Sequence, residues 1–177
     1  MNRVVQVFVE RASARRQSLL ELVSVVPGDS WTRKAPGEPW DAFRHLAHAL
    51  SADSGVADVI PEFVRHKPTS IQIEELLSRR ENAITRAAAL DIESLVALGH
   101  QARREVLATL ERLDQTDLER QLSFLDQRSA WSQPAQITLF AYLAQWSHHD
   151  AEHESAIRTA ISTPPDLSAV AQTRRIR

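Results

Sequence analysis

Apolar side chains recur at intervals of three and four residues along four long segments of the chain. These segments are residues 3–26, 40–65, 91–113 and a last stretch that ends at Thr163. The spacing places the apolar side chains on one face of an α-helix and the polar side chains on the others. The pattern therefore predicts four long amphipathic helices.

Local signals set the expected starts of these helices. Pro39 suits the first position of the second helix, because the N–H that proline lacks has no partner there anyway. Asp91 has the side chain and the place of an N-cap for the third helix. The fourth helix is expected to open at Ser132 or Gln133, directly before Pro134.

The segments between the predicted helices are less regular. Thr69 and Gln72 have the spacing of a capping box for a short helix, and so have Thr116 and Glu119. Residues 123–133 are expected to form a loop. No segment shows the sustained apolar–polar alternation that is typical of a strand.

The expected fold class is therefore all-α. Four long helices with longer connections around the third favour a four-helix bundle with extra short helices at that place. We expect a single bundle over residues 1–163 and a polar tail over 164–177. Such bundles build metal and cofactor sites from side chains on facing helices.

The composition narrows the classes of function. The 177 residues are 43% hydrophobic and 25% charged, which is ordinary for a soluble globular domain. The formal net charge of −2 argues against nucleic-acid binding, which usually needs a basic surface. No apolar run approaches the length of a membrane span or of a signal-peptide core, so a cytoplasmic protein is expected. The absence of cysteine excludes disulfides, thiolate metal ligands and a cysteine nucleophile.

Three of the seven histidines lie within six residues of the last predicted helix. His149 and His153 are four residues apart, so their side chains lie one turn apart on one face, roughly 6 Å from each other. They share that face with Trp146, whereas His148 and Glu152 fall on a polar face and are expected to be exposed. Two imidazoles at this spacing can bind one metal ion. The alternative is a pair of buried histidines that are satisfied by hydrogen bonds.

A third ligand would have to come from another helix. His48 lies on a secondary apolar arc of the second predicted helix, together with the small residues Ala52 and Gly55. His45 is a rival three residues earlier, and the pattern alone leaves both open. His100 lies off the apolar stripe of the third predicted helix and is expected to face solvent.

Other residues of the last helix have two interpretations each. Asp150 is an acid on the inward face, where it could orient a ligating imidazole or act as a base. A structural hydrogen bond to a neighbouring helix explains Asp150 equally well. Tyr142 and Trp146 could wall a pocket beside the histidines, and the alternative for both is a place in the hydrophobic core.

These features together resemble the DinB/YfiT-like family. The resemblance rests on the spacing from Trp40 to His48, on the segment 136–139, and on the paired histidines His149 and His153 that follow it. It covers nearly the whole chain. Members of the family are four-helix bundles, and many bind a divalent metal through one histidine of the second helix and two of the fourth.

Carried over by position, the resemblance implies that His48, His149 and His153 are the metal ligands, with His48 preferred to His45. Three imidazoles suit zinc, nickel or a similar ion. Relatives include thiol-dependent transferases and a mycothiol-dependent isomerase, which implies a small-molecule substrate and a low-molecular-weight thiol as partner. The family often has a glutamine three residues after the last histidine, where this chain has Ala156. That departure leaves the specific chemistry open.

Three hypotheses for the function result. The first is a metal-dependent enzyme, either a thiol-dependent transferase or a hydrolase that acts on a small molecule. The second is a helical bundle that binds a metal or a small ligand without turnover. The third is an interaction module with structural histidines. Bundles of this kind often pair through a helix face, so a homodimer is kept open beside a monomer.

Overall fold

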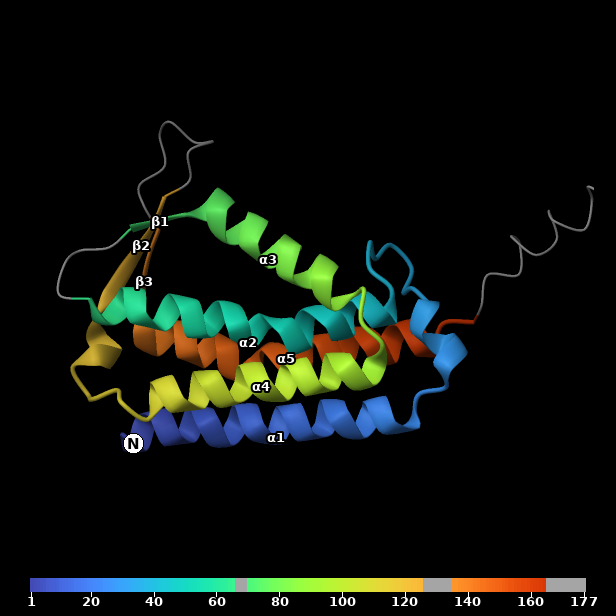
Figure 1. Cartoon of the computed structure of the whole chain (residues 1–177), viewed down its shortest axis with the longest axis horizontal. Coiled ribbons are helices and arrows are strands. Elements are labelled where there is room, and N and C mark those ends of the chain that lie inside the picture. Colours follow the sequence, from blue (N-terminus) through green and yellow to red (C-terminus); the bar gives the residue numbers. More distant parts are fainter. Residues whose placement is uncertain (66–69, 126–134, 165–177) are drawn as a thin grey trace, which may run out of the picture.

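The computed structural model describes residues 1–65, 70–125 and 135–164, and this part of the chain is mostly helical (Figure 1). Its α-helices are α1 (Arg3–Val25), α2 (Ala42–Val64), α3 (Ile73–Ala87), α4 (Ile92–Leu110) and α5 (Leu139–Ser162). Two short 3₁₀ helices are η1 (Gly28–Thr32) and η2 (Asp117–Glu119). The strands are β1 (Ser70–Gln72), β2 (Gln121–Leu125) and β3 (Ala135–Thr138).

The long helices α1, α2, α4 and α5 lie alongside one another, which confirms the predicted four-helix bundle (Figure 1). α2 packs against both α4 and α5, and α1 packs against α5. α3 packs on α2 from outside the bundle and leads from the small sheet back towards α4 (Figure 1). None of the helices in the described ranges is long and apolar enough to cross a membrane.

The second helix starts later than the sequence predicts. Pro39 is not its first residue, because α2 begins at Ala42 with Asp41 as the N-cap. The Asp41 carboxylate accepts a hydrogen bond from the backbone N–H of Arg44 at 2.8 Å, which satisfies one of the free donors of the first turn. The predicted N-cap Asp91 is confirmed, since its carboxylate accepts the backbone N–H three residues on.

The last helix also starts later than predicted. The expected opening at Ser132 or Gln133 before Pro134 lies outside the described residues. α5 begins at Leu139, and Thr138 is its N-cap. The four residues of β3, which the prediction counts as helix, pair with β2 instead.

The three-stranded sheet is not predicted from the sequence. β1 pairs with β2 in parallel, and β2 pairs with β3 antiparallel. Residues 123–125, predicted as loop, belong to β2, whereas the remainder of that loop, Thr69 and the tail beyond residue 164 lie outside the described ranges. The short helix predicted after Thr69 is α3, and the turn predicted at Thr116 is η2.

The core consists of two apolar clusters with a buried layer of charge between them. The cluster towards the sheet includes Phe8, Val56, Val106 and Leu143. The other includes Leu19, Leu50, Leu95 and Ile157. Along each long helix one buried charged residue falls between the two clusters, and these residues are Arg16, Asp53, Arg103 and Asp150.

Candidate metal centre

Three histidines from two helices meet at one place in the bundle. His149 and His153 lie one turn apart on α5, with ring centroids 4.6 Å apart. Because α2 packs against α5, the ring of His48 lies 4.8 Å from that of His149 and 4.6 Å from that of His153. Each ring offers one nitrogen, and these nitrogens all lie within 4.8 Å of one another. The structure therefore brings together the three residues that the sequence singles out.

The spacing of the nitrogens fits a metal ion of the zinc type. The Nε2 atoms of His48 and His149 are 3.3 Å apart. Two nitrogens that each lie about 2.0–2.1 Å from a tetrahedral ion are separated by about 3.3–3.4 Å. The buried Nδ1 of His48 has no hydrogen-bond partner within residues 1–65, 70–125 and 135–164. The described residues therefore do not satisfy both nitrogens of the His48 ring.

The electrostatics keep the three rings neutral. Burial, followed by repulsion from His149 and Arg80, lowers the pKa of His48 to about 3. Burial, followed by repulsion from His149 and His48, lowers the pKa of His153 to about 2. Burial also lowers the pKa of His149, although the negative charge of Asp150 acts in the opposite direction. Neutral imidazole is the form that donates a lone pair to a metal.

His45, the rival ligand, contacts the cluster from its edge. Its Nδ1 lies 3.1 Å from the Nδ1 of His153. One of these two atoms must carry the proton of that hydrogen bond. When Nδ1 of His153 carries the proton and donates it in the hydrogen bond, the Nε2 lone pair of His153 is free for a metal. His45 then orients the ring of His153 by accepting that hydrogen bond. His45 is therefore suited to support a ligand rather than to replace His48.

Trp40 covers the same cluster. Its ring lies 5.3 Å from His45, 5.3 Å from His48 and 6.3 Å from His153, measured between centroids. In the sequence, Trp40 is only a landmark eight residues before His48. Its place just before the N-cap of α2 directs the indole onto the histidines, a contact that the spacing alone does not reveal.

Asp150 is held by arginines. Arg16 donates to it through Nε and Nη2, at 2.8 and 3.1 Å, and Arg103 donates through Nη2 at 2.8 Å. Asp53 accepts from the same two guanidinium groups, from Arg103 Nε at 2.6 Å and from Arg16 Nη2 at 3.2 Å. These contacts favour the structural interpretation of Asp150 among those that the sequence leaves open.

The buried cluster of four charged residues is not predicted from the sequence. It contains two arginines and two aspartates, so its formal charges balance. The signal that could reveal it is a charged residue on the apolar stripe of every long helix. Arg16, for example, stands between the core positions Ala12 and Leu19, at steps of four and three.

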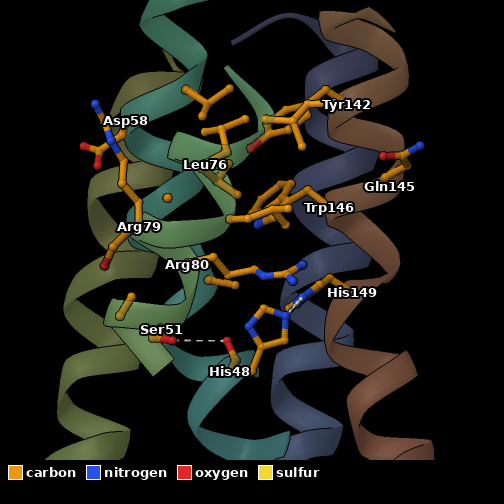
Figure 2. Close-up of a pocket in the computed structure, with 18 of the residues that line it drawn as sticks. His48, Ser51, Asp58, Leu76, Arg79, Arg80, Tyr142, Gln145, Trp146 and His149 are labelled. Atoms are coloured by element: carbon orange, nitrogen blue, oxygen red, sulfur yellow. Dashed lines mark hydrogen bonds between the residues drawn. The ribbon is translucent and has the colours of Figure 1, made fainter. Parts of the chain in front are cut away.

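A cavity of about 1390 Å³ lies between α2, α3, α5 and the sheet, and the histidines stand at one end of it (Figure 2). His48 and His149 belong to its lining, and so do Tyr142 and Trp146. Trp146 also belongs to the core, and its Nε1 donates to Asp53 at 2.8 Å. Both predicted interpretations of Trp146, pocket wall and core, therefore hold.

The remaining histidine predictions are confirmed. His148 is exposed, and its Nε2 lies 3.1 Å from a guanidinium nitrogen of Arg11. His100 and Glu152 are exposed as well. The register of the helices thus separates the clustered histidines from the solvent-facing ones.

Comparison with known proteins gives one family and several solved structures of similar fold. The sequence model of the DinB superfamily matches residues 11–157. No curated protein matches the sequence. A crystal structure of the mycothiol-dependent maleylpyruvate isomerase has a TM-score of 0.65 at 13% identity, over 96% of this chain and 68% of the other. A histidine-to-alanine mutant of that isomerase has a TM-score of 0.58 at 12% identity, over 89% and 63%. At these identities the likeness shows a shared fold.

Proposed function

Because this chain belongs to the DinB superfamily, we propose that it is a metal-dependent enzyme in which His48, His149 and His153 bind one divalent ion, zinc or nickel. The observation that carries the proposal is the closeness of their ring nitrogens, all within 4.8 Å of one another. The lowered pKa values of the three rings support it, because neutral rings bind a metal at neutral pH without first losing protons.

An ion held by three imidazoles keeps a position open for a small ligand and activates a bound water or thiol. The chain's own residues supply the binding site around it. Trp146 and Tyr142 give the adjoining cavity an apolar wall that accepts an apolar substrate group. Burial raises the pKa of Tyr142, so this phenol stays protonated and can donate a hydrogen bond.

We propose a thiol-dependent transferase or a hydrolase that acts on a small molecule. Support for a thiol comes from the shared fold with an isomerase that is described as mycothiol-dependent. Since the chain contains no cysteine, the thiol has to arrive as a low-molecular-weight cosubstrate. A cavity of about 1390 Å³ exceeds the usual size of a single-ligand site, which is about 300–1,000 Å³. This volume suits two small substrates bound together.

One departure favours binding without turnover as the second candidate. Ala156, half-buried on α5, stands where the resemblance leads us to expect a glutamine. An alanine supplies no polar atom for a substrate. A protein that binds metal and a small molecule but catalyses nothing would fit this loss.

The test begins with the metal. Protein purified without a histidine tag is expected to contain about one equivalent of zinc or nickel by elemental analysis. His149→Ala is expected to lose it, whereas the exposed neighbour variant His148→Ala keeps it. Absence of metal from the wild type, with no change in thermal stability on adding zinc or nickel, would contradict the proposal.

The second step separates an enzyme from a binding protein. The metal-loaded protein is screened with low-molecular-weight thiols and small electrophiles, and with ester and amide substrates. Turnover that disappears in His149→Ala supports the enzyme. Stoichiometric metal without turnover of any of these substrates supports the binding protein.

A further inference from the structure

An arginine of α3 reaches the histidine end of the cavity. Arg80 lines the cavity together with His48 and His149. Figure 2 shows its side chain extending from α3 towards the rings of these two histidines. Burial is the main cause of the low pKa values of His48 and His153, and the charge of Arg80 contributes to both. A positive charge therefore stands beside the proposed metal ligands.

Arg80 is exposed, and its charge has no carboxylate partner among the described residues. Its neighbour Arg79 forms an ion pair with Glu75 on the same helix. The next residue, Glu81, is paired with Arg44 of α2. No carboxylate within the described part of the chain forms an ion pair with Arg80. A guanidinium group in this position is available to an anionic ligand.

Neither of the two acids that line the cavity forms an ion pair with Arg80. Asp58 lies towards the Tyr142 end of the cavity. Burial is the main cause of the raised pKa of Tyr142, and the charge of Asp58 raises it further. Figure 2 shows Asp58 on the α2 side, far along the cavity from His48. Glu152 also lines the cavity, near enough to His149 for its charge to act on that ring, and its side chain is exposed to solvent. The histidine end therefore presents a cation, and the rest of the wall is largely apolar.

The apolar part of the wall comes from three elements. Trp146 and Tyr142 of α5 face Leu76 of α3 across the cavity (Figure 2). Ile137 of β3 and Phe124 of β2 also line it. A ligand that fits both regions carries a negative charge at one end and an apolar body at the other.

We infer that this cavity binds an organic carboxylate, with the carboxylate held by Arg80 beside the histidine cluster and the apolar body against Trp146 and Tyr142. A guanidinium group matches a carboxylate with two parallel hydrogen bonds. The inference rests on the proposed function, because a divalent ion on the histidines adds a second positive charge at the same end. It goes beyond that function by assigning a substrate class and a specificity-determining residue.

The test is a binding comparison with two probes that share a carbon skeleton and differ in the head group, a carboxylate in one and a neutral hydroxyl in the other. Zinc-loaded full-length protein is titrated calorimetrically with 4-phenylbutyrate and with 4-phenyl-1-butanol. We expect the carboxylate to bind at least about tenfold more tightly than the alcohol, since a hydrogen bond to a charged group is roughly twice as strong as one between neutral groups. Arg80→Gln is expected to reduce this preference clearly and to leave alcohol binding unchanged, whereas the part that the zinc ion contributes remains.

The matched control is Arg104→Gln, which removes an exposed arginine of α4 that does not line the cavity. This variant is expected to bind both probes as the wild type does. Equal affinity of the wild type for the two probes would overturn the inference. So would an Arg80→Gln variant that keeps the full carboxylate preference, or an equal loss in Arg104→Gln.

The same titrations distinguish the two proposals from each other. Stoichiometric zinc without a carboxylate preference overturns the inference and leaves the metal centre intact. A carboxylate preference that depends on Arg80 in protein that binds no zinc supports the anion site and overturns the metal centre. Zinc content is measured in every variant, so that a loss of metal is not mistaken for a loss of anion binding.

Discussion

The Nδ1 atom of His45 lies 3.1 Å from the Nδ1 atom of His153, a contact between the second and last long helices of the bundle. The other histidine on the first turns of α2, His48, faces His149 of α5, with the two Nε2 atoms 3.3 Å apart. His45 instead contacts the Nδ1 side of the His153 ring. The pair gives His153 a fixed orientation, and a fixed tautomer when His153 is the donor.

This relationship predicts different effects of two substitutions at His45. The side-chain oxygen of asparagine can accept the same hydrogen bond as Nδ1, whereas leucine cannot. His45→Leu is expected to weaken zinc binding about 10–100-fold, as the loss of a supporting hydrogen bond usually does. His45→Asn is expected to keep most of the affinity. Competition with a chromophoric chelator measures both, and equal losses in the two variants would contradict the supporting role.

The pKa values of His48 and His153 predict how stability depends on pH in the metal-free protein. The unfolded-state pKa is about 6.5, so the unfolded chain binds more protons than the folded one between about pH 6.5 and pH 3. The free energy of unfolding is therefore expected to fall as the pH drops through this window. At pH 4.5 the expected loss is about 2–3 kcal/mol for each of the two histidines.

Urea unfolding with a chelator present, at pH 7 and at pH 4.5, measures this dependence. His153→Gln removes one of the titrating groups and is expected to show a smaller difference between the two pH values. A difference as large as that of the wild type would assign the acid sensitivity to other groups.

The contacts of Asp150 predict that it acts on stability. Asp150→Asn removes a charge that two buried arginines share, and we expect the free energy of unfolding to fall by about 3–5 kcal/mol. Zinc stoichiometry of the folded variant is expected to remain that of the wild type. Glu152→Gln, an exposed change two residues away, is the control and should stay within about 0.5 kcal/mol. A variant of normal stability that loses zinc would show instead that Asp150 supports the ligands.

Gly99 allows α4 to approach α2 closely. A Cβ atom at this position would lie 2.9 Å from Leu50 Cδ2 and 3.1 Å from Nη1 of Arg16. Gly99→Ala is therefore expected to lower the free energy of unfolding by about 1–2 kcal/mol, because overpacking exceeds the gain in helix propensity. Gly55→Ala on α2 meets nothing within 4 Å and is expected to raise it by about 0.5–1 kcal/mol. Thermal unfolding of both variants measures whether each becomes more or less stable than the wild type. Changes of the same sign in the two variants would contradict this prediction.

The helices and the histidine pair are predictable because their signals are local. The i, i+4 spacing of His149 and His153 fixes their common face in any helix, and the carboxylate of Asp91 marks a helix start without reference to the remainder of the fold. The choice of His48 over His45 is different. The periodicity of α2 permits both, and only the family resemblance favours His48.

The parts that escape prediction depend on contacts between distant segments. β1 is three residues long and pairs with β2, with Ser70 opposite Ser123, and segments this short carry no periodic signal. The start of α5 differs from the prediction for the same reason. The backbone of β3, predicted as helix, forms its hydrogen bonds with β2 instead. Arg80 is an ordinary charge in the sequence, and only the packing of α3 on α2 brings it to the histidines.

The buried charge cluster has a consequence for the alignment of the helices along the bundle axis. Apolar side chains pack with many neighbours, so an apolar core alone tolerates a helix that slides by one turn, about 5.4 Å. Here such a slip would separate Asp53 or Asp150 from the arginines and leave a charge unpaired in the interior. Asp53 is five residues from His48, and Asp150 is adjacent to His149. The ion pairs therefore hold α2 and α5 at the one relative height at which the imidazoles of the two helices face each other.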